Sequence, residues 1–113
     1  MIHGNFVSIA GGGGHVGTPL GLALSSKGYN VILIDKNKEN MKKINNGEMP
    51  FIEKGWAKLL NKMISKKKIF ATPELSEVKK CKYIIVCLGT PINNKFEPNL
   101  KNFTNFFLVL KNI

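Results

Sequence analysis

A run of glycines near the amino terminus is the part of this sequence best suited to chemistry. The stretch reads IAGGGGHVGTPLG over residues 9–21, and it fits the spacing G-x-G-x-x-G in one register only, at Gly12, Gly14 and Gly17. Glycines allow a tight turn and let backbone amides approach a bound anion. A helix that begins there also directs its free amides and its positive dipole end toward the same place. The stretch therefore predicts a site for a phosphate-bearing ligand.

The segments around the glycines predict the elements that such a site needs. Residues 5–10, NFVSIA, are short, partly β-branched and typical of a buried strand. Residues 15–27 have apolar side chains at helical spacing, and Pro19 fits the first turn of that helix, where an N–H has no intrahelical acceptor. Residues 30–34, NVILI, predict a second buried strand with Asp35 at its carboxyl end.

Asp35 completes a pattern that is typical of dinucleotide-binding sites. It follows Gly17 by 18 residues and stands at the end of the next strand. An acidic side chain there accepts hydrogen bonds from the adenosine ribose and repels a 2′-phosphate, which favours NAD over NADP. Lys36 and Lys38, beside it, weaken that preference. The alternative for Asp35 is a turn or helix-capping role before the next helix.

Two further residues are candidates for contact with the cofactor. We expect His15 to contribute its backbone N–H, and a catalytic imidazole is the alternative. Thr90 follows the predicted strand at 82–88, at the edge where open α/β sheets bind ligands, so its hydroxyl is a candidate partner for the nicotinamide-side ribose. The alternative for Thr90 is a turn residue within Gly89-Thr90-Pro91.

The rest of the chain alternates between helical and strand patterns. Helices are predicted at 36–46, 53–65 and 73–80 and from 99 onward, and strands at 68–71 and 82–88. This alternation implies right-handed crossovers and a parallel sheet covered on both sides. We expect one domain of the α/β class, with a Rossmann-like parallel sheet and helices on both faces.

Composition argues against several partners. The net charge of +10 suggests nucleic acid, but all 17 basic residues are lysine, and the bidentate contacts of arginine are missing. The alternative, nucleic-acid binding by the basic surface, predicts a steep salt dependence. No apolar run approaches the ~20 residues of a membrane span, and no secretory signal is evident, so we expect a cytoplasmic protein. Cys81 and Cys87 indicate neither a disulfide framework nor a metal site.

Four stretches together resemble the UDP-glucose/GDP-mannose dehydrogenase family. They are GGGGHVGTPLGLAL, VILIDKN, NNGEMPFIEKG and VCLGTPINNKFEPNL, of which the last two are the most diagnostic. NNGEMPFIEKG and GTPINNKFEPN look closest to the branch that acts on UDP-N-acetylated hexosamines. Thr18 and Lys54 depart from the leucine and proline that are usual in the family.

The resemblance implies an NAD-dependent enzyme that oxidises a nucleotide sugar to its uronic acid in two hydride transfers, through a thiohemiacetal and a thioester on a cysteine. It implies that Val16 and His15 surround the pyrophosphate with the glycines, and that Asp35 and Thr90 contact the two riboses. The expected NAD contacts are Gly12, Gly14, His15, Val16, Gly17, Asp35, Lys36 and Thr90. The family's catalytic residues lie beyond the matching region, so no catalytic residue is expected here, and neither Cys81 nor Cys87 matches the catalytic cysteine.

The length of family members implies that residues 1–113 are a partial N-terminal NAD-binding domain, truncated after about four strands, with the central and C-terminal UDP-sugar-binding domains absent. The nucleotide sugar is then a ligand of a full-length enzyme only. In the Rossmann strand order the apolar strand at 83–88 lies at an edge, near the aromatic stripe at 103–107, so we expect a homo-oligomer through that strand or the C-terminal helix. The alternative is a non-catalytic, stand-alone dinucleotide-binding or interaction module.

Overall fold

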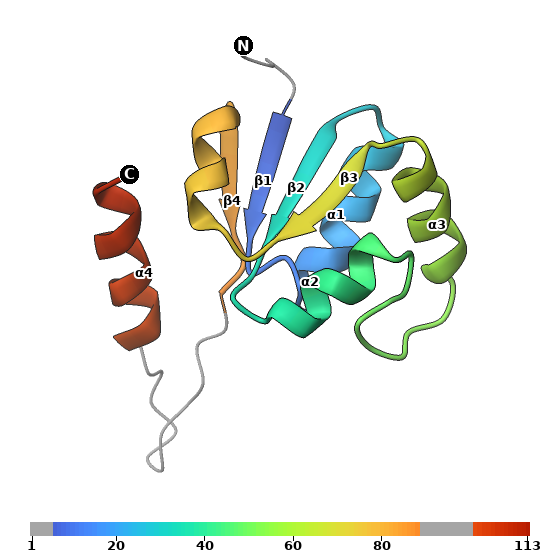
Figure 1. Ribbon diagram of the computed structural model, residues 1–113, viewed down its shortest axis with the longest axis horizontal. Coiled ribbons are helices and arrows are strands. Elements are labelled where there is room, and N and C mark those ends of the chain that lie inside the picture. The colour runs from blue at the N-terminus through green and yellow to red at the C-terminus, as the bar shows by residue number, and fades with distance from the viewer. Residues whose placement is uncertain (1–5, 89–100) are drawn as a thin grey trace.

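Two apolar runs in the first third of the chain form the centre of a parallel sheet. In this computed structural model, which describes residues 6–88 and 101–113, β1 (Phe6–Ala10) pairs in parallel with β2 (Asn30–Ile34). The strands β3 (Ile69–Thr72) and β4 (Tyr83–Val86) extend the sheet in the order β3-β2-β1-β4, as Figure 1 shows. The predicted α/β fold is confirmed, and this order is the 3-2-1-4 portion of a Rossmann sheet.

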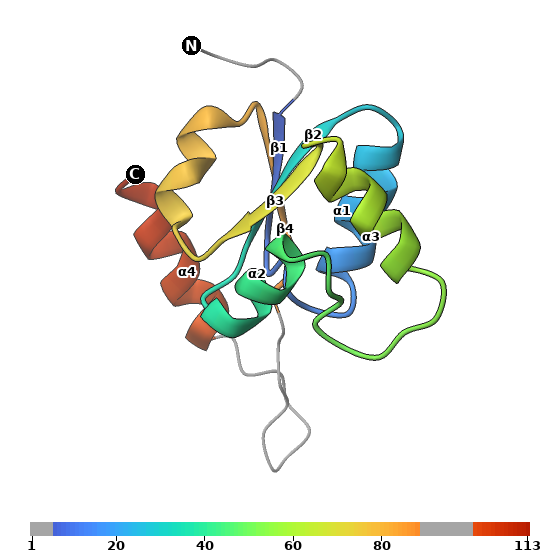
Figure 2. The same cartoon turned by 45° about the vertical axis from the view of Figure 1, so that its right-hand side comes forward.

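Helices cover both faces of the sheet. They are α1 (Gly17–Ser26), α2 (Lys38–Asn45), α3 (Ala57–Ser65), the 3₁₀ helix η1 (Leu75–Lys80) and α4 (Lys101–Lys111). Figure 2, in which the strands overlap, shows α1 and α3 on one side of the sheet and η1 and α4 on the other. In the described part of the chain, no helix is both long and apolar enough to cross a bilayer.

Each face of β2 has its own hydrophobic core, because side chains alternate along a strand. Val31 and Leu33 are buried in a cluster with side chains of α1, α2 and α3. Ile32 and Ile34 face the other way and pack with residues of η1 and α4. Burial on both faces explains why NVILI is apolar without interruption.

Two helices begin later than their hydrophobic patterns predict. The helix expected at 15–27 begins at Gly17, with Val16 at its N-cap, because the glycine turn extends two residues further. The helix expected at 53–65 begins at Ala57, because Gly55 has a φ of +92°, which a right-handed helix does not contain. The segment from 47 to 56 thus becomes a long connection between α2 and α3.

Candidate functional site

The chain leaves β1 through a tight turn at Gly11. This residue has a φ of +82°, and a Cβ added to it would collide with the carbonyl oxygen of Cys87. The amides of Gly11 and Gly12 donate to the carbonyl of Ile34 at 2.8 and 3.0 Å, which ties the turn to β2. Gly11 lies outside the G-x-G-x-x-G register, so the spacing does not identify the glycine that makes this turn. Its signal in the sequence is that the run of four glycines begins one residue before the register, at Gly11.

The three glycines of the register have different surroundings. A Cβ on Gly17 would collide with the carbonyl oxygen of Gly11, so only glycine lets α1 approach the turn this closely. A Cβ on Gly12 would lie 2.7 Å from the Cβ of Leu33. Beside Gly14 the space is open, because the nearest atom to its Cβ position is the Gly11 carbonyl oxygen at 3.5 Å. A ligand can therefore approach the backbone at Gly14.

Unpaired amides lie next to this open space. His15 and Val16 are exposed, and within the described residues their N–H groups have no hydrogen-bond acceptor. They stand at the amino-terminal end of α1, whose first turn contains no acidic residue. The amides and the helix dipole therefore favour an anion at this position.

Asp35 holds the glycine turn from the end of the neighbouring strand. One of its carboxylate oxygens accepts from the amide of Gly13 at 3.0 Å, and the other accepts from the amide of Asn37 at 3.0 Å. A carboxylate offers about four acceptor positions, so Asp35 can still accept from two hydroxyl groups. The capping half of the alternative is wrong, because the side chain of Asn37 caps α2 by accepting from the amide of Asn40 at 3.0 Å. The turn role is present beside the contact with Gly13, because Asp35 accepts from the amide two residues further on.

Two side chains that the spacing does not identify also support the turn. Thr18, one of the departures from the family pattern, is fully buried, and its hydroxyl donates to the carbonyl of Gly12 at 2.6 Å. The side-chain amide of Asn40 donates to the carbonyl of Gly13 at 3.4 Å. The Thr18 bond is local, whereas the Asn40 contact depends on how α2 packs beside the turn, which residue spacing does not encode.

The imidazole of His15 has an aromatic neighbour. Its ring stacks on Phe51 with 4.1 Å between the centroids and 25° between the planes. Phe51 belongs to the connection between α2 and α3, within the NNGEMPFIEKG stretch. The structure therefore brings one of the two most diagnostic stretches of the sequence against the glycine turn.

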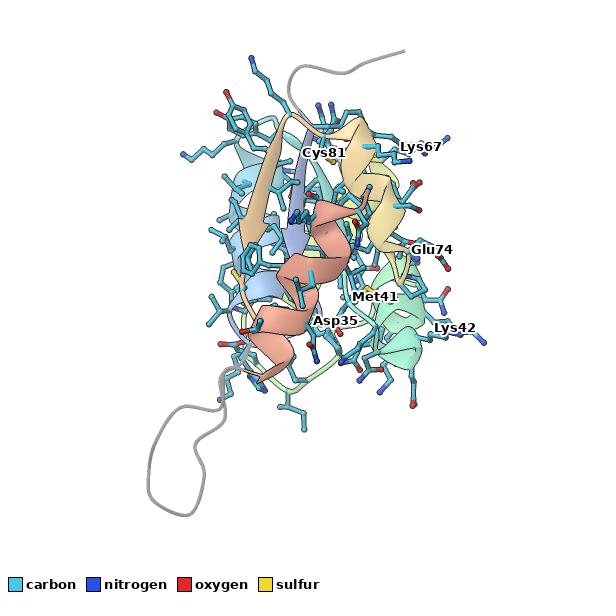
Figure 3. The ribbon with its side chains drawn as sticks, turned by 90° about the vertical axis from the view of Figure 1, so that its left-hand side faces the viewer. Asp35, Met41, Lys42, Lys67, Glu74 and Cys81 are labelled. Atoms are coloured by element: carbon cyan, nitrogen blue, oxygen red, sulfur yellow. The ribbon has the colours of Figure 1, made fainter. Side chains whose placement is uncertain are left out.

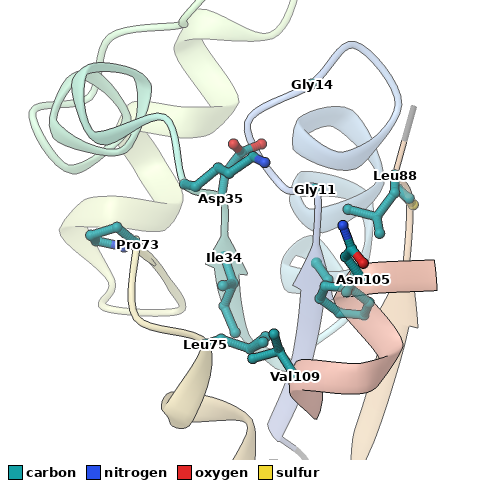
Figure 4. Close-up of a pocket in the computed structure, with 13 residues that line it drawn as sticks. Gly11, Gly14, Ile34, Asp35, Pro73, Leu75, Leu88, Asn105 and Val109 are labelled. Carbon is teal, nitrogen blue, oxygen red and sulfur yellow. The ribbon is translucent and has the colours of Figure 1, made fainter. Parts of the chain in front are cut away.

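A cavity of about 510 Å³ opens where β1 and β2 end. Its polar end includes Gly14, Asp35 and Lys36, and its apolar walls include Leu75 and Val109. Figure 4 shows Asp35 near the glycine turn at one end, and Leu75 and Val109 at the other. This volume lies within the range of small-molecule and cofactor sites. Thr90, the predicted ribose contact, lies outside the described residues.

Of the two cysteines, Cys87 lines this cavity and Cys81 does not. Figure 3 shows Cys81 at the opposite end of the molecule from Asp35. Burial raises the pKa of the Cys81 thiol, which donates to the carbonyl of Glu77 at 3.7 Å, so the reactive thiolate is disfavoured. Among residues 6–88 and 101–113, no three His, Cys, Asp or Glu side chains are grouped to hold a metal ion.

A parallel sheet in this order, with a glycine turn at the start of α1 and an acidic residue after β2, defines a dinucleotide-binding Rossmann domain. The chain belongs to the UDP-glucose/GDP-mannose dehydrogenase family, because the model of that family's NAD-binding domain matches residues 7–112.

Curated relatives and solved structures agree with this assignment. A GDP-mannose 6-dehydrogenase of Pseudomonas savastanoi pv. phaseolicola is 35% identical over 79 residues, which cover 69% of this chain and 18% of the relative. A UDP-N-acetyl-D-mannosamine dehydrogenase of Pyrococcus horikoshii is 32% identical over 87 residues, which cover 77% of this chain and 21% of the relative. The structure of a GDP-mannose dehydrogenase from Pseudomonas aeruginosa matches with a TM-score of 0.84 at 27% identity, over 88% of this chain and 23% of that one. This chain thus spans about a fifth of the length of these relatives.

Proposed function

We propose that this chain binds NAD as the cofactor-binding part of a nucleotide-sugar 6-dehydrogenase. The observation that carries the proposal is the pair of unpaired amides at His15 and Val16, which lie beside the open face of Gly14. Asp35 lines the same cavity as Gly14 and keeps two acceptor positions free. An anion site next to Gly14, and a ribose acceptor in the cavity that Gly14 lines, fit the two polar parts of an adenine dinucleotide.

The residues of this site bind the cofactor and orient it. The amides of His15 and Val16 would donate to the pyrophosphate, and Gly14 would leave room for it. Asp35 would accept from the adenosine ribose, and the apolar walls at Ile34 and Leu75 would exclude water from the adenine. NAD, when bound, would supply the hydride acceptor, and the residues of this chain would hold the cofactor in place. Lys36, exposed at the rim of the cavity, adds positive charge on the adenosine side.

The oxidation of the sugar belongs to a longer enzyme in this proposal. This chain spans about a fifth of relatives whose names give GDP-mannose or UDP-N-acetyl-D-mannosamine as substrate. We propose a UDP-hexose or UDP-N-acetylhexosamine as the substrate of that enzyme, on the strength of NNGEMPFIEKG and GTPINNKFEPN. Residues 1–113 then act as a partial NAD-binding domain, and a cytoplasmic location remains a prediction.

Calorimetric titration with NAD⁺ and NADP⁺ tests the proposal. We expect saturable binding of NAD⁺ and binding of NADP⁺ that is about tenfold weaker or more, because Asp35 repels the 2′-phosphate. Asp35→Asn keeps an acceptor for the Gly13 amide but removes the charge, so the preference for NAD⁺ should shrink. Glu39→Gln, an exposed acid in the first turn of α2, is the matched control and should keep the preference.

Two results would overturn the proposal. Equal affinities for the two cofactors would mean that Asp35 does not discriminate at the ribose. If neither cofactor binds to the folded chain, residues 1–113 keep the family fold without its cofactor function, and a non-catalytic interaction module becomes the better account.

A further inference from the structure

The connection between α2 and α3 is held at both ends. At its start, the side-chain amide of Asn61 donates to the carbonyl of Gly47 at 3.0 Å and to that of Ala57 at 2.9 Å. Met49 and Trp56 pack against the core beneath α1, α2 and α3. The backbone that carries Phe51 is therefore anchored from α3 and from the core, independently of the glycine turn.

Within this connection, neighbouring apolar residues differ sharply in what they contact. Phe51 is half-buried and lies over the ring of His15, at a centroid distance of 4.1 Å. Ile52, the next residue, is fully exposed. The stack is thus specific to Phe51 and is not a general collapse of the connection onto α1.

The stack reaches the part of the glycine turn that has the fewest other restraints. The amides of Gly11, Gly12 and Gly13 all donate to β2 or Asp35. Within the described residues, the amide and the imidazole of His15 have no hydrogen-bond partner, so the ring of Phe51 is the main contact that fixes this exposed residue.

We propose that Phe51 is a positioning residue for the anion site at the start of α1. Its ring holds His15 so that the amides of His15 and Val16 already face the pyrophosphate before the cofactor binds. A turn that is ordered in advance loses less conformational entropy on binding, which increases affinity. This inference rests on the proposed function, because it assumes that the anion is the pyrophosphate of NAD.

A double-mutant cycle on NAD⁺ affinity tests this role, with Phe51→Ala, His15→Ala and the double variant measured by calorimetry. Aromatic pairs contribute enough that each single substitution should weaken binding about three- to tenfold. If Phe51 acts through His15, the affinity of the double variant for NAD⁺ should be no lower than that of the single variant with the lower affinity. Phe51→Tyr keeps a flat ring and should bind within about twofold of the native chain. Ile52→Ala is the matched control and should bind like the native chain.

The possible results separate the two proposals. A native chain that fails to bind NAD⁺ contradicts the proposed function before any variant is measured. If the native chain binds and the two single effects multiply in the double variant, or if Phe51→Ala binds as the native chain does, the positioning role is wrong. If thermal unfolding shows that Phe51→Ala is not folded, Phe51→Leu replaces it in the cycle, because leucine keeps the apolar bulk but cannot stack on His15. Either of the same two results would then show that the positioning role is wrong.

Discussion

Gly14 and Gly17 belong to one spacing pattern, yet the structure requires them for different reasons. Gly17 has no room for a side chain, because a Cβ would lie 2.8 Å from the Cα of Gly12 and closer still to the carbonyl of Gly11. Gly14 has room, and it lines the same cavity as Asp35. Gly17 is therefore required by the packing of α1 against the turn, and Gly14 leaves space for a ligand to approach the backbone.

This contrast predicts opposite effects of two alanine substitutions. Gly17→Ala forces α1 away from the turn and should lower the free energy of unfolding by about 1–3 kcal/mol, as overpacking does. Gly14→Ala should change that free energy by less than about 0.5 kcal/mol but weaken NAD⁺ binding about tenfold, through lost hydrogen bonds to a charged group. Urea unfolding and calorimetry on both variants check this, and a destabilised Gly14→Ala that binds normally would contradict it.

The spacing of residues predicts the parts of the site that follow from local backbone geometry. Gly17 begins α1 and Asp35 directly follows β2, as the pattern predicts, because a helix start and a strand end are set largely by neighbours in sequence. Gly11 and Phe51 were not predicted as parts of the site, because Gly11 meets β2 and Cys87, and Phe51 meets His15, only in the folded chain. Thr18 donates to Gly12, six residues away, but a hydroxyl at that position is not part of the glycine spacing. The described residues do not include Thr90, so its role remains a prediction.

At the level of the elements, α1, α2 and α3 end in the same hydrogen-bond pattern. In each, two backbone amides beyond the last turn donate back to carbonyls of that turn, as in the Schellman motif. The position that needs a positive φ is Gly28 after α1 and Gly47 after α2, but it is Lys67 after α3, with a φ of 57°. Lysine pays a steric penalty there that glycine avoids.

Lys67→Gly should therefore increase the free energy of unfolding by about 0.5–1 kcal/mol. This net gain is the steric penalty of lysine at a positive φ minus the conformational entropy that glycine adds to the unfolded state. Lys66→Gly is the control, because Lys66 has an ordinary φ of −82° and glycine there brings only the entropic cost. Thermal and urea unfolding of the two variants measure the difference. A Lys67→Gly variant that is less stable than Lys66→Gly would contradict this account of the end of α3.

The pattern of apolar residues predicts which elements form but not where each begins. Most strands fall within a residue or two of their expected bounds, because β-branched runs between turns leave few alternatives. The start of α3 is displaced to Ala57, because the positive φ of Gly55 is a backbone property that hydrophobic spacing does not report. The segment at 73–80 forms the 3₁₀ helix η1, of which only Val78 is buried.

At the scale of the whole molecule, β4 leaves an open, apolar edge of the sheet. β4 pairs only with β1 in the described part of the chain, and Tyr83 and Ile84 on it are 51% and 40% exposed. On α4, Leu108 and Val109 are also more than half exposed. For residues 1–113 on their own, we propose that a second copy of the chain covers this edge, because an unpaired apolar strand is a template for pairing. In the longer enzyme of the proposed function, the next strand of the Rossmann order would lie there instead. The net charge of +10 opposes this association.

Light scattering over a dilution series should therefore show a dimer whose stability increases with salt, because salt screens the repulsion between two basic chains. Ile84→Lys should shift the equilibrium toward monomer. Phe70→Lys, at the exposed β3 edge on the other side of the sheet, is the matched control and should leave it unchanged. Monomeric behaviour at every concentration and salt level would rule out the pairing.

An amide-resolved NMR titration of the chain with NAD⁺ is the most direct test of the central claim, that the start of α1 binds the pyrophosphate. The account predicts saturable shifts, largest at the amides of Gly14, His15 and Val16, with smaller shifts near Asp35 and none at the exposed β3 residue Phe70. Saturable binding that leaves those three amides unshifted, or a folded spectrum that NAD⁺ does not change, would contradict it.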